Sequence, residues 1–409
     1  MKILMVNKFF YVKGGSETYY FSLKKLLESK GHIVIDFSMQ DERNYPSEYS
    51  KYFVSGVDYN RPLGVIDKIK AGVNIIYSLE AKNKFEQLIL DTKPDIIHLH
   101  IFQHQLSPSI LDVIKKYNIP TVYTAHDLKM LCLNYKMMHH GENCEQCKGG
   151  RYYYCVKNKC VKNSLIKSSV NIMEGYLHKW HRSYDVIDKI ITPSEFYRNK
   201  FIEFGIKPER IIHIPNFLDT TTPIISSRQD KEYYYLYFGR LSEEKGVMTL
   251  IKSFKNISEK LYIVGTGPIK EQAIGYIKEN NMNNVKLLGF MSGQELKDIV
   301  GNAKAVILPS EWYENGPYSA IEALQLGRPI IGANIGGIPE LIVNNGFLFE
   351  SGNTNDLAKQ IVEMSKMPPN KYAEMKRASM YLFENFYTAE VHYKQIKTIY
   401  REVMSSHEE

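Results

Sequence analysis

The sequence has no apolar run that approaches the ~18 residues of a membrane-spanning helix. Its opening apolar stretch, Met1–Val6, is too short for a secretion signal and predicts a first strand instead. These two absences predict a cytoplasmic protein. With 409 residues, 44% hydrophobic and 24% charged, the chain has an ordinary globular composition and room for two domains, each with its own core.

Outside one segment, the chain also lacks any excess of charge. Its formal net charge is +7, and residues 129–182 alone carry ten Lys or Arg against three Glu, which gives the same +7. No recognisable nucleic-acid-binding module accompanies this charge, so we expect no nucleic-acid partner.

Cysteine is scarce, and all five cysteines fall in that same basic segment, beginning with Cys132. In a cytoplasmic chain such a group favours metal binding over disulfides. Four thiolates could hold a closed, structural zinc ion, and the candidate ligands are Cys144, Cys147, Cys155 and Cys160. The second pair is spaced more loosely than usual, and free buried thiols are an equally weighted alternative.

The first half of the chain alternates between strand and helix patterns. Lys2–Val6 predicts a strand, a loop with Gly14 and Gly15 follows, and an amphipathic helix over 18–29 leads to a strand over 32–39. Nucleotide-binding folds open in this order, and the paired glycines let backbone amides approach an anion closely. Further strands are predicted over 95–100, 121–124, 188–192 and 210–214.

A polar stretch over 220–230 predicts an interdomain linker, after which the alternation starts again. Strands are predicted over 233–238, 260–264, 285–288, 304–308 and 329–332, with helices near 244–256, 268–280, 293–301 and 318–326. Helices near 354–366 and 370–403 follow. This alternation predicts an α/β fold class with doubly wound parallel sheets.

The main candidate site is the loop that follows the predicted strand 304–308. Pro317 suits the first position of the next helix, whose free amides at Tyr318 and Ser319 would point at a phosphate. Glu314 and Glu322 bracket the start of that helix. One carboxylate near a sugar and one that accepts from a ribose diol would suit a nucleotide-sugar, although acidic residues near a helix start also serve as ordinary dipole partners.

Two cations, Arg240 and Lys245, follow the predicted strand 233–238. They would lie at the edge where parallel strands bind ligands, and could neutralise a diphosphate leaving group without a metal. A solvated loop is the alternative.

His126 comes directly after the predicted strand 121–124. A histidine there could contact a bound sugar or shuttle a proton, and a structural histidine is the alternative. Gly265 and Gly267 also follow a strand but lack the third glycine of a dinucleotide fingerprint, so NAD binding is not predicted.

Taken together, these residues resemble glycosyltransferase family 4, the retaining nucleotide-sugar transferases of GT-B fold. The resemblance covers most of the chain and rests on four stretches in the family's order: Gly14-Gly15, Ala125-His126-Asp127, Phe238 to Gly246, and Glu314 to Glu322. The cysteine-rich stretch is similar to that of a bacterial subgroup associated with surface polysaccharide assembly.

The resemblance implies two Rossmann-like doubly wound domains that face a central cleft. An acceptor-side domain would occupy 1–215, a linker 216–232, and a nucleotide-sugar-binding domain 233–380. A C-terminal helix within 381–409 would cross back to the first domain.

The resemblance also implies roles for individual residues. The catalytic pair would be Glu314, beside the donor sugar, and His126, which would contact that sugar from the other domain. The donor-binding set would be Gly14, Gly15, Arg240, Lys245, Asn315, Gly316, Pro317, Tyr318 and Glu322. Within it, Arg240, Lys245 and the Gly15 amide would grip the diphosphate, and Glu322 the ribose hydroxyls. The Pro317-Tyr318 pair departs from the second glycine and aliphatic residue common in the family, which leaves the donor sugar open.

The implied activity is transfer of a sugar, with retention, from a nucleoside-diphosphate sugar to a glycan or lipid-linked acceptor, with no cofactor required for catalysis. A GT-B nucleotide-sugar epimerase and a catalytically silent nucleotide-sugar-binding subunit are the alternatives. The basic segment 129–182 predicts peripheral contact with an anionic membrane, at its inner face, or with a lipid-diphosphate acceptor; a solvated basic face is the equally weighted alternative.

Overall fold

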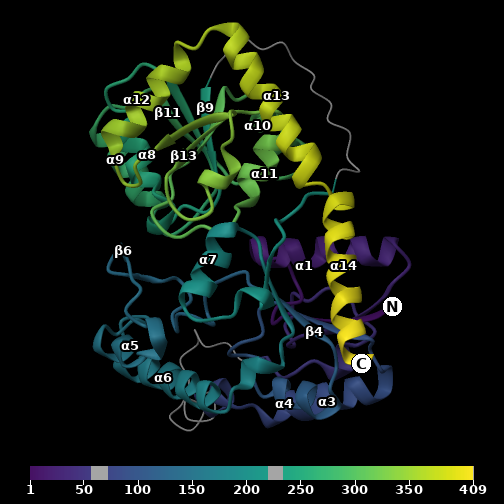
Figure 1. Cartoon of the computed structure of the whole chain (residues 1–409). Coiled ribbons are helices and arrows are strands. Elements are labelled where there is room, and N and C mark those ends of the chain that lie inside the picture. Colours follow the sequence, from purple (N-terminus) through teal and green to yellow (C-terminus); the bar gives the residue numbers. More distant parts are fainter. Residues whose placement is uncertain (57–71, 220–233, 409) are drawn as a thin grey trace.

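The described residues, 1–56, 72–219 and 234–408 of a computed structural model, form two parallel sheets of six strands, one in each half of the chain (Figure 1). The first sheet ends with β8 at His213 and the second begins with β9 at Tyr234. Most of the predicted linker, 216–232, lies outside the described residues. The predicted α/β class with two doubly wound domains is confirmed.

The N-terminal sheet has the strand order β2-β1-β3-β4-β7-β8, and all its pairs are parallel. Its strands are β1 (Lys2–Val6), β2 (Ile33–Phe37), β3 (Ile96–Leu99), β4 (Thr121–Thr124), β7 (Lys189–Thr192) and β8 (Ile211–His213). They are short apolar runs buried on both faces, as a parallel sheet covered by helices requires. The chain reverses its direction of winding at β1, so the crevice for a ligand opens where β1 and β3 end.

Helices and a small hairpin complete this domain. The helices are α1 (Gly15–Ser29), α3 (Leu79–Thr92), α4 (Ile110–Tyr117), α5 (Tyr153–Lys157), α6 (Leu165–Trp180) and α7 (Glu195–Glu203). The hairpin is an antiparallel pair of two-residue strands, β5 (Met138–His139) and β6 (Glu142–Asn143). It belongs to the cysteine-rich segment, which extends beside the main sheet.

The C-terminal sheet repeats the same plan, with the strand order β11-β10-β9-β12-β13-β14. Its strands are β9 (Tyr234–Phe238), β10 (Lys260–Val264), β11 (Val285–Gly289), β12 (Ala305–Leu308), β13 (Ile330–Ala333) and β14 (Gly346–Phe349). Its helices are α8 (Val247–Ser253), α9 (Lys270–Glu279), α10 (Gly293–Gly301), α11 (Tyr318–Gln325), α12 (Thr354–Ser365) and α13 (Pro369–Phe386). Here the winding reverses between β9 and β12, which brings the loops with Arg240 and Glu314 to one crevice.

The predicted continuous helix over 370–403 is wrong, because the chain breaks between α13 and α14 (Ala389–Glu408). At the break, the Leu218 amide donates to the Tyr387 carbonyl at 3.0 Å, and Leu218 pairs with Thr388 as an isolated bridge. Leu218, a few residues after β8, therefore lies against the break between the two helices. The predicted boundary at residue 381 falls inside α13.

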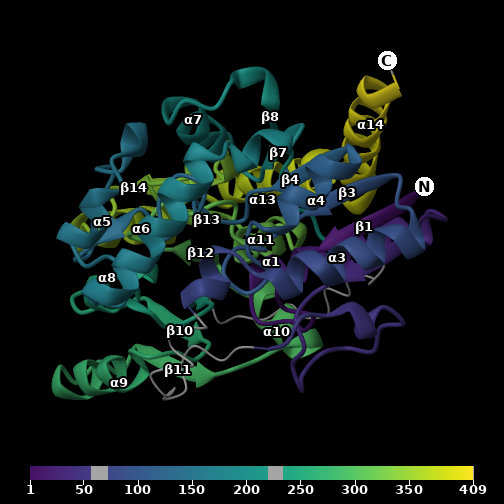
Figure 2. The same cartoon turned by 90° about the horizontal axis from the view of Figure 1, so that it is seen from below.

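Helix α14 lies on the N-terminal domain, apart from the C-terminal sheet, in both views (Figures 1 and 2). Five of its side chains join the core formed by β1 and α1: Tyr393, Ile396, Ile399, Tyr400 and Val403. The Tyr400 hydroxyl also hydrogen-bonds His98 Nδ1 at 2.6 Å, inside that core. The last helix is therefore part of the first domain's core.

Candidate active site

Glu314 lies in the loop between β12 and α11, and only 5% of it is exposed. Lys245 Nζ lies 2.5 Å from Glu314 Oε1, and the Ser310 hydroxyl donates to the same oxygen at 2.7 Å. Burial pushes the pKa of this carboxyl up, but the charge and hydrogen bonds of Lys245 and Ser310 outweigh burial and hold the pKa below its ordinary value. Glu314 is therefore an ionised carboxylate at neutral pH.

A glycine pair after β13 fixes the backbone of Glu314. The Gly337 amide donates to the Glu314 carbonyl at 2.8 Å. Gly336 has a φ of +59°, and a Cβ there would stand 2.5 Å from the Glu314 amide nitrogen. A side chain at Gly336 would therefore displace the carboxylate that the loop presents.

Lys245 is held in place by the next residue. Gly246 has a φ of +65°, and a Cβ there would stand 1.8 Å from the Pro309 carbonyl oxygen. The loop after β9 and the loop after β12 therefore touch through backbone, and Lys245 lies beside Glu314 as a direct result.

Glu322 is in the second turn of α11, mostly buried. Burial raises the pKa of its carboxyl to about 7, and the charge of Lys297 on α10 opposes this only in part. Such a group is half protonated at neutral pH and becomes a better acceptor as the pH rises.

Pro317 was predicted to be the first residue of this helix, but α11 begins one residue later. Pro317 is the N-cap, with φ −66° and ψ 135°, and the first helical residue is Tyr318. The extended ψ places Pro317 just outside the helix. The Tyr318 ring crosses to the other domain, where a Cβ on Gly15 would stand 3.5 Å from it. The glycine loop and the start of α11, both predicted to bind the donor, therefore lie within contact distance of each other.

Asn315 and Gly316 join the two domains. Asn315 Nδ2 donates to the Ala125 carbonyl at 2.9 Å, and Ser194 donates to Asn315 Oδ1 at 2.9 Å. Asn216 Nδ2 donates to the Gly316 carbonyl at 2.9 Å. The residue after Glu314 therefore hydrogen-bonds the residue before His126, which brings the two predicted catalytic residues to the same part of the contact between the domains.

His126 belongs to a group of aromatic rings at the ends of β3 and β4. Its Nε2 shares a hydrogen bond with His100 Nδ1 at 3.1 Å, and its ring stacks on that of His100. The Tyr19 ring meets it edge-on at 5.0 Å. Burial lowers the pKa of His126 to about 3, so it is neutral at physiological pH and can offer a hydrogen bond but no positive charge.

Arg240 follows β9 with an exposed side chain. The Tyr237 hydroxyl donates to its carbonyl at 2.7 Å, which fixes the backbone. In the part of the chain that the structure describes, its guanidinium has no hydrogen bond or ion pair. All the donors of the Arg240 guanidinium are therefore unpaired within the described residues.

Several residues of the site were not predicted. Tyr19 and His100 are buried in contact with His126, and Lys8 lies just after β1. Burial lowers the pKa of Lys8, while the charges of Asp127 and Glu17 oppose this shift. His100 and Lys8 each follow a strand of the first sheet, and that position was the signal that could have found them.

The five cysteines are all free thiols, three of them buried. Burial raises the pKa of Cys132 to about 11 and of Cys147 to about 12, and a hydrogen bond with Cys155 raises that of Cys160. Within the described ranges, no three His, Cys, Asp or Glu side chains form a group that could hold a metal ion. The zinc site on Cys144, Cys147, Cys155 and Cys160 therefore stays a prediction.

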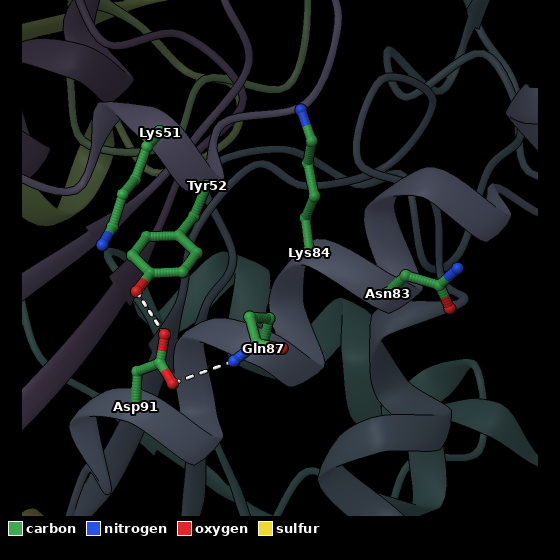
Figure 3. A pocket seen from close by; sticks show the side chains of 6 residues that line it. All are labelled: Lys51, Tyr52, Asn83, Lys84, Gln87 and Asp91. Atoms are coloured by element: carbon green, nitrogen blue, oxygen red, sulfur yellow. Dashed lines mark hydrogen bonds between the residues drawn. The ribbon is translucent and has the colours of Figure 1, made fainter.

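An open hollow of about 420 Å³ lies on the N-terminal domain, away from these residues. Figure 3 shows Tyr52 and Gln87 pointing at Asp91, with hydrogen bonds from both. Its lining is Lys51, Tyr52, Asn83, Lys84, Gln87 and Asp91. It contains none of the predicted site residues.

Two doubly wound domains that meet at their strand ends form the GT-B architecture, a class of sugar-transferring enzymes. The chain belongs to glycosyltransferase family 4: the sequence model of that family matches residues 13–222, and the model of glycosyl transferases group 1 matches residues 220–380. The family resemblance and the GT-B fold predicted from the sequence are confirmed.

Known relatives agree with this assignment. An uncharacterized glycosyltransferase of Methanocaldococcus jannaschii is 24% identical over 368 residues, which cover 89% of this chain and 88% of the relative. A putative colanic acid biosynthesis glycosyltransferase of Escherichia coli is 21% identical over 57% of this chain and 61% of its own. Relatives of this chain thus include glycosyltransferases of polysaccharide biosynthesis.

Solved structures show the same fold. Sucrose-phosphate synthase from Thermosynechococcus elongatus matches with a TM-score of 0.72 at 19% identity, over 99% of both chains. Anabaena HepE, solved with UDP-glucose, matches with a TM-score of 0.61 at 20% identity, over 99% of this chain and 100% of that one. No helix in the described ranges is both long and apolar enough to span a membrane.

Proposed function

We propose that this chain transfers a sugar, with retention of anomeric configuration, from a nucleoside-diphosphate sugar to a glycan or lipid-linked acceptor in bacterial surface polysaccharide assembly. One observation carries the proposal: the buried Glu314 carboxylate is kept ionised by Lys245 and is linked through Asn315 to the His126 loop. A buried charge held at a cleft between two domains is costly for a fold and is typical of a site that stabilises charge in a reaction.

In the proposed reaction, the bond between the anomeric carbon and the diphosphate oxygen breaks while the acceptor hydroxyl forms its bond on the same face. The leaving phosphate takes the proton of that hydroxyl. Positive charge develops on the sugar and negative charge on the phosphate. Glu314 would stabilise the first, and Lys245 with Arg240 the second.

Lys245 can bind Glu314 and the diphosphate at the same time, because an ammonium group has three donors and Glu314 occupies one of them. Arg240, exposed and without a partner in the described residues, would add a planar fork for the same diphosphate. Neutral His126 would hydrogen-bond a sugar hydroxyl, and Glu322 the ribose diol.

The relatives support the donor class. HepE was solved with UDP and glucose and with UDP-glucose, and relatives of this chain are named for colanic acid, amylovoran and O-antigen synthesis. A cleft that holds a nucleoside-diphosphate sugar in the same fold would use the crevice between β9 and β12.

The first experiment is a thermal-shift panel with UDP, GDP, dTDP, ADP and CMP, since a ligand that binds only the folded state raises its melting temperature. We expect one nucleoside diphosphate to raise the melting temperature, and Lys245→Ala to abolish that shift. If none raises the melting temperature, the proposed donor site is contradicted, whereas a shift without any sugar transfer would favour the binding-subunit alternative.

Product analysis then separates transfer from epimerisation. With the donor sugar identified, an enzyme that needs an acceptor and yields the same anomeric configuration as the donor supports the proposal. Conversion of the donor without any acceptor would identify an epimerase instead.

We also propose that catalysis requires no metal, because Arg240 and Lys245 supply the positive charge. The transfer rate should be unchanged in EDTA, and a loss restored by Mg²⁺ would contradict this. The four-thiolate zinc site remains a prediction, which the metal content of the purified protein tests.

A further inference from the structure

Helix α6 is amphipathic in the reverse of the usual sense. The side chains that it buries are all polar: Ser168, Asn171, Glu174 and His178. Most of the large side chains that it exposes are apolar or aromatic: Leu165, Ile166, Met173, Tyr176 and Trp180, beside the two lysines Lys167 and Lys179. A surface helix of a globular domain normally buries its apolar face and exposes its polar one.

Hydrogen bonds to the buried face fix the rotation of α6. Lys129 Nζ donates to Asn171 Oδ1 at 2.8 Å and to Glu174 Oε2 at 2.9 Å. His178 Nε2 donates to the Ile76 carbonyl at 2.8 Å. Turning the apolar face inward would break these bonds and leave Lys129 buried without its carboxylate, so the exposure of the apolar face is built into the fold.

The exposed apolar side chains form a continuous stripe. Ile166, Met173 and Trp180 are 79%, 60% and 81% exposed, and their spacing of seven residues aligns them along one side of the helix. Figure 1 shows α5 and α6 at the edge of the N-terminal domain that faces away from the C-terminal domain. Tyr153 on the neighbouring α5 is 52% exposed as well.

Within residues 151–182 the exposed charges are all of one sign, and the acidic partner next to them is Asp185, which pairs with Arg182. Residues 151–182 contain seven Lys or Arg and a single acidic residue, Glu174, which is buried against Lys129. The exposed basic residues are Arg151, Lys157, Lys159, Lys162, Lys167, Lys179 and Arg182. A second copy of this chain would bring these cations face to face, so charge disfavours a symmetric dimer through α6.

We propose that α6 and the basic residues around it form a docking surface for an anionic phospholipid bilayer, with the helix lying in the interface. An apolar stripe that ends in a tryptophan and is flanked by cations has the chemistry that partitions into such an interface. This proposal rests on the proposed function in one respect, namely that the bilayer would present a lipid-linked acceptor. Lys129, three residues after His126, ties α6 to the chain that follows β4, so docking would hold the N-terminal domain at the membrane.

The first test is co-sedimentation of the full chain with vesicles of phosphatidylglycerol and phosphatidylcholine, with pure phosphatidylcholine for comparison. We expect binding to the anionic vesicles only. The triple variant Ile166→Ser, Met173→Ser, Trp180→Ser and the double variant Lys159→Glu, Lys167→Glu should each weaken that binding on the order of tenfold or more.

Matched controls use equally exposed residues on the C-terminal domain. Tyr381 is 62% exposed near the end of α13, and Lys366 and Lys371 are exposed near the start of that helix. Tyr381→Ser and the double variant Lys366→Glu, Lys371→Glu should bind anionic vesicles as the unaltered protein does. Equal losses in these controls and in the α6 variants would overturn the proposal, since binding would then follow net charge or hydrophobicity alone.

Tryptophan emission locates the contact. The chain has two tryptophans, so Trp312→Phe leaves Trp180 as the sole reporter. Its emission should move to shorter wavelength with anionic vesicles and become shielded from acrylamide. Binding without such a change would place the contact elsewhere, and a change that depends on protein concentration without vesicles would mean that a second copy covers α6; either result overturns the proposal.

These tests are independent of the transferase reaction. If vesicle binding holds while no nucleoside diphosphate shifts the melting temperature, the proposed function fails and the docking surface stands. If the nucleotide binds and vesicles do not, the docking surface alone fails.

Discussion

Glu314 and Glu322 lie at the start of the same helix, yet their surroundings push their pKa values in opposite directions. Lys245 and Ser310 overcome burial at Glu314 and keep it charged. At Glu322 burial dominates and raises the pKa to about 7. One carboxyl is therefore charged throughout the physiological range, while the charge of the other depends on pH.

Glu314→Gln should lower the transfer rate on the order of 10²-fold or more, because the amide keeps the shape and removes the charge that would stabilise the sugar cation. Steady-state kinetics on the identified donor measure it. Glu311→Gln is the matched control, because Glu311 lies in the same loop as Glu314 and accepts a hydrogen bond from the Thr249 hydroxyl of α8 at 2.6 Å. This substitution should leave the rate within about twofold. A Glu314→Gln enzyme of normal rate would exclude this role.

Nucleotide affinity should rise between about pH 6 and pH 8, because ionised Glu322 accepts hydrogen bonds from a ribose diol better than its protonated form does. Titration calorimetry across that range measures it. The rise attributable to Glu322 should vanish in Glu322→Gln, while titration of the nucleotide phosphate stays common to both proteins. An identical pH profile in both would contradict the assignment.

The same group makes an opposite prediction for stability. The folded-state pKa of Glu322, about 7, lies above its unfolded value of 4.5, so stability falls as the pH rises through that interval. Glu322→Gln should therefore raise the melting temperature at about pH 8 and leave it unchanged at about pH 5. A lower melting temperature at both pH values would show that the carboxylate is paired in the folded protein.

At the scale of elements, the site is built from loops that touch through backbone. The loop after β9 meets the loop after β12 at Gly246 and Pro309, and the turn after β13 supports Glu314 through Gly336 and Gly337. Three strand-end loops of the C-terminal sheet thus fix one carboxylate. Gly246 and Gly336 have to be glycine because a Cβ at either would collide with the backbone of the neighbouring loop.

Gly336→Ala should reduce kcat/KM at least about tenfold, because the added Cβ would stand 2.5 Å from the Glu314 amide nitrogen and displace the carboxylate. Gly352→Ala is the matched control, since Gly352 has a φ of +77° and no atom within 4 Å of an added Cβ. Both variants should lose comparable stability from backbone strain, of order 1 kcal/mol. Equal kinetic losses in the two would assign the effect to strain alone.

The elements of regular pattern were predictable. The strand over 121–124 and the strand over 260–264 are found at the predicted residues, because short apolar runs between turns leave few alternatives. The strand β14 (Gly346–Phe349) was missed, since Gly346 and Asn345 at its start suggest a turn. The break between α13 and α14 contacts Leu218, more than 160 residues away, and no local pattern reveals that contact.

Within the candidate site, position after a strand was the signal that predicted Glu314, Lys245 and His126. The pairing of Lys245 with Glu314 follows from the strand order, which brings β9 and β12 together. The role of Asn315 as a bond between domains could not be predicted, because it requires the relative placement of two separately folded sheets.

At the scale of the whole molecule, a row of buried histidines connects the cleft to α14. His126 contacts His100, which stacks on His98, and His98 bonds Tyr400 of α14. His392 of α14 accepts from the Tyr19 hydroxyl at 3.0 Å and donates to the Pro215 carbonyl at 2.9 Å. Burial lowers all four pKa values, to about 3 for His126 and His392, so the row is neutral in the folded protein.

Acid should therefore destabilise the protein. The folded-state pKa values lie below the unfolded value of 6.5, so the unfolded chain binds more protons below about pH 6.5 and stability falls as the pH drops from there toward about 3. Each such histidine contributes up to about 1.4 kcal/mol per pH unit. Urea unfolding at several pH values measures the slope.

His392→Gln should reduce that slope by about one histidine's share, while His140→Gln, at an exposed histidine, should leave it unchanged. The glutamine amide can still donate to the Pro215 carbonyl, which limits other losses. An unchanged slope in His392→Gln would mean that this histidine is protonated in the folded protein.

The position of α14 has a consequence for the order of events during synthesis. Many two-domain chains complete their first domain while the second is still being translated. Here Ile396, Ile399 and Tyr400 fill a core that otherwise belongs to β1 and α1. The N-terminal domain, which leaves the ribosome first, therefore cannot complete its core until the last helix has been made. Until then the apolar faces of β1 and α1 are exposed to solvent and are available to a chaperone.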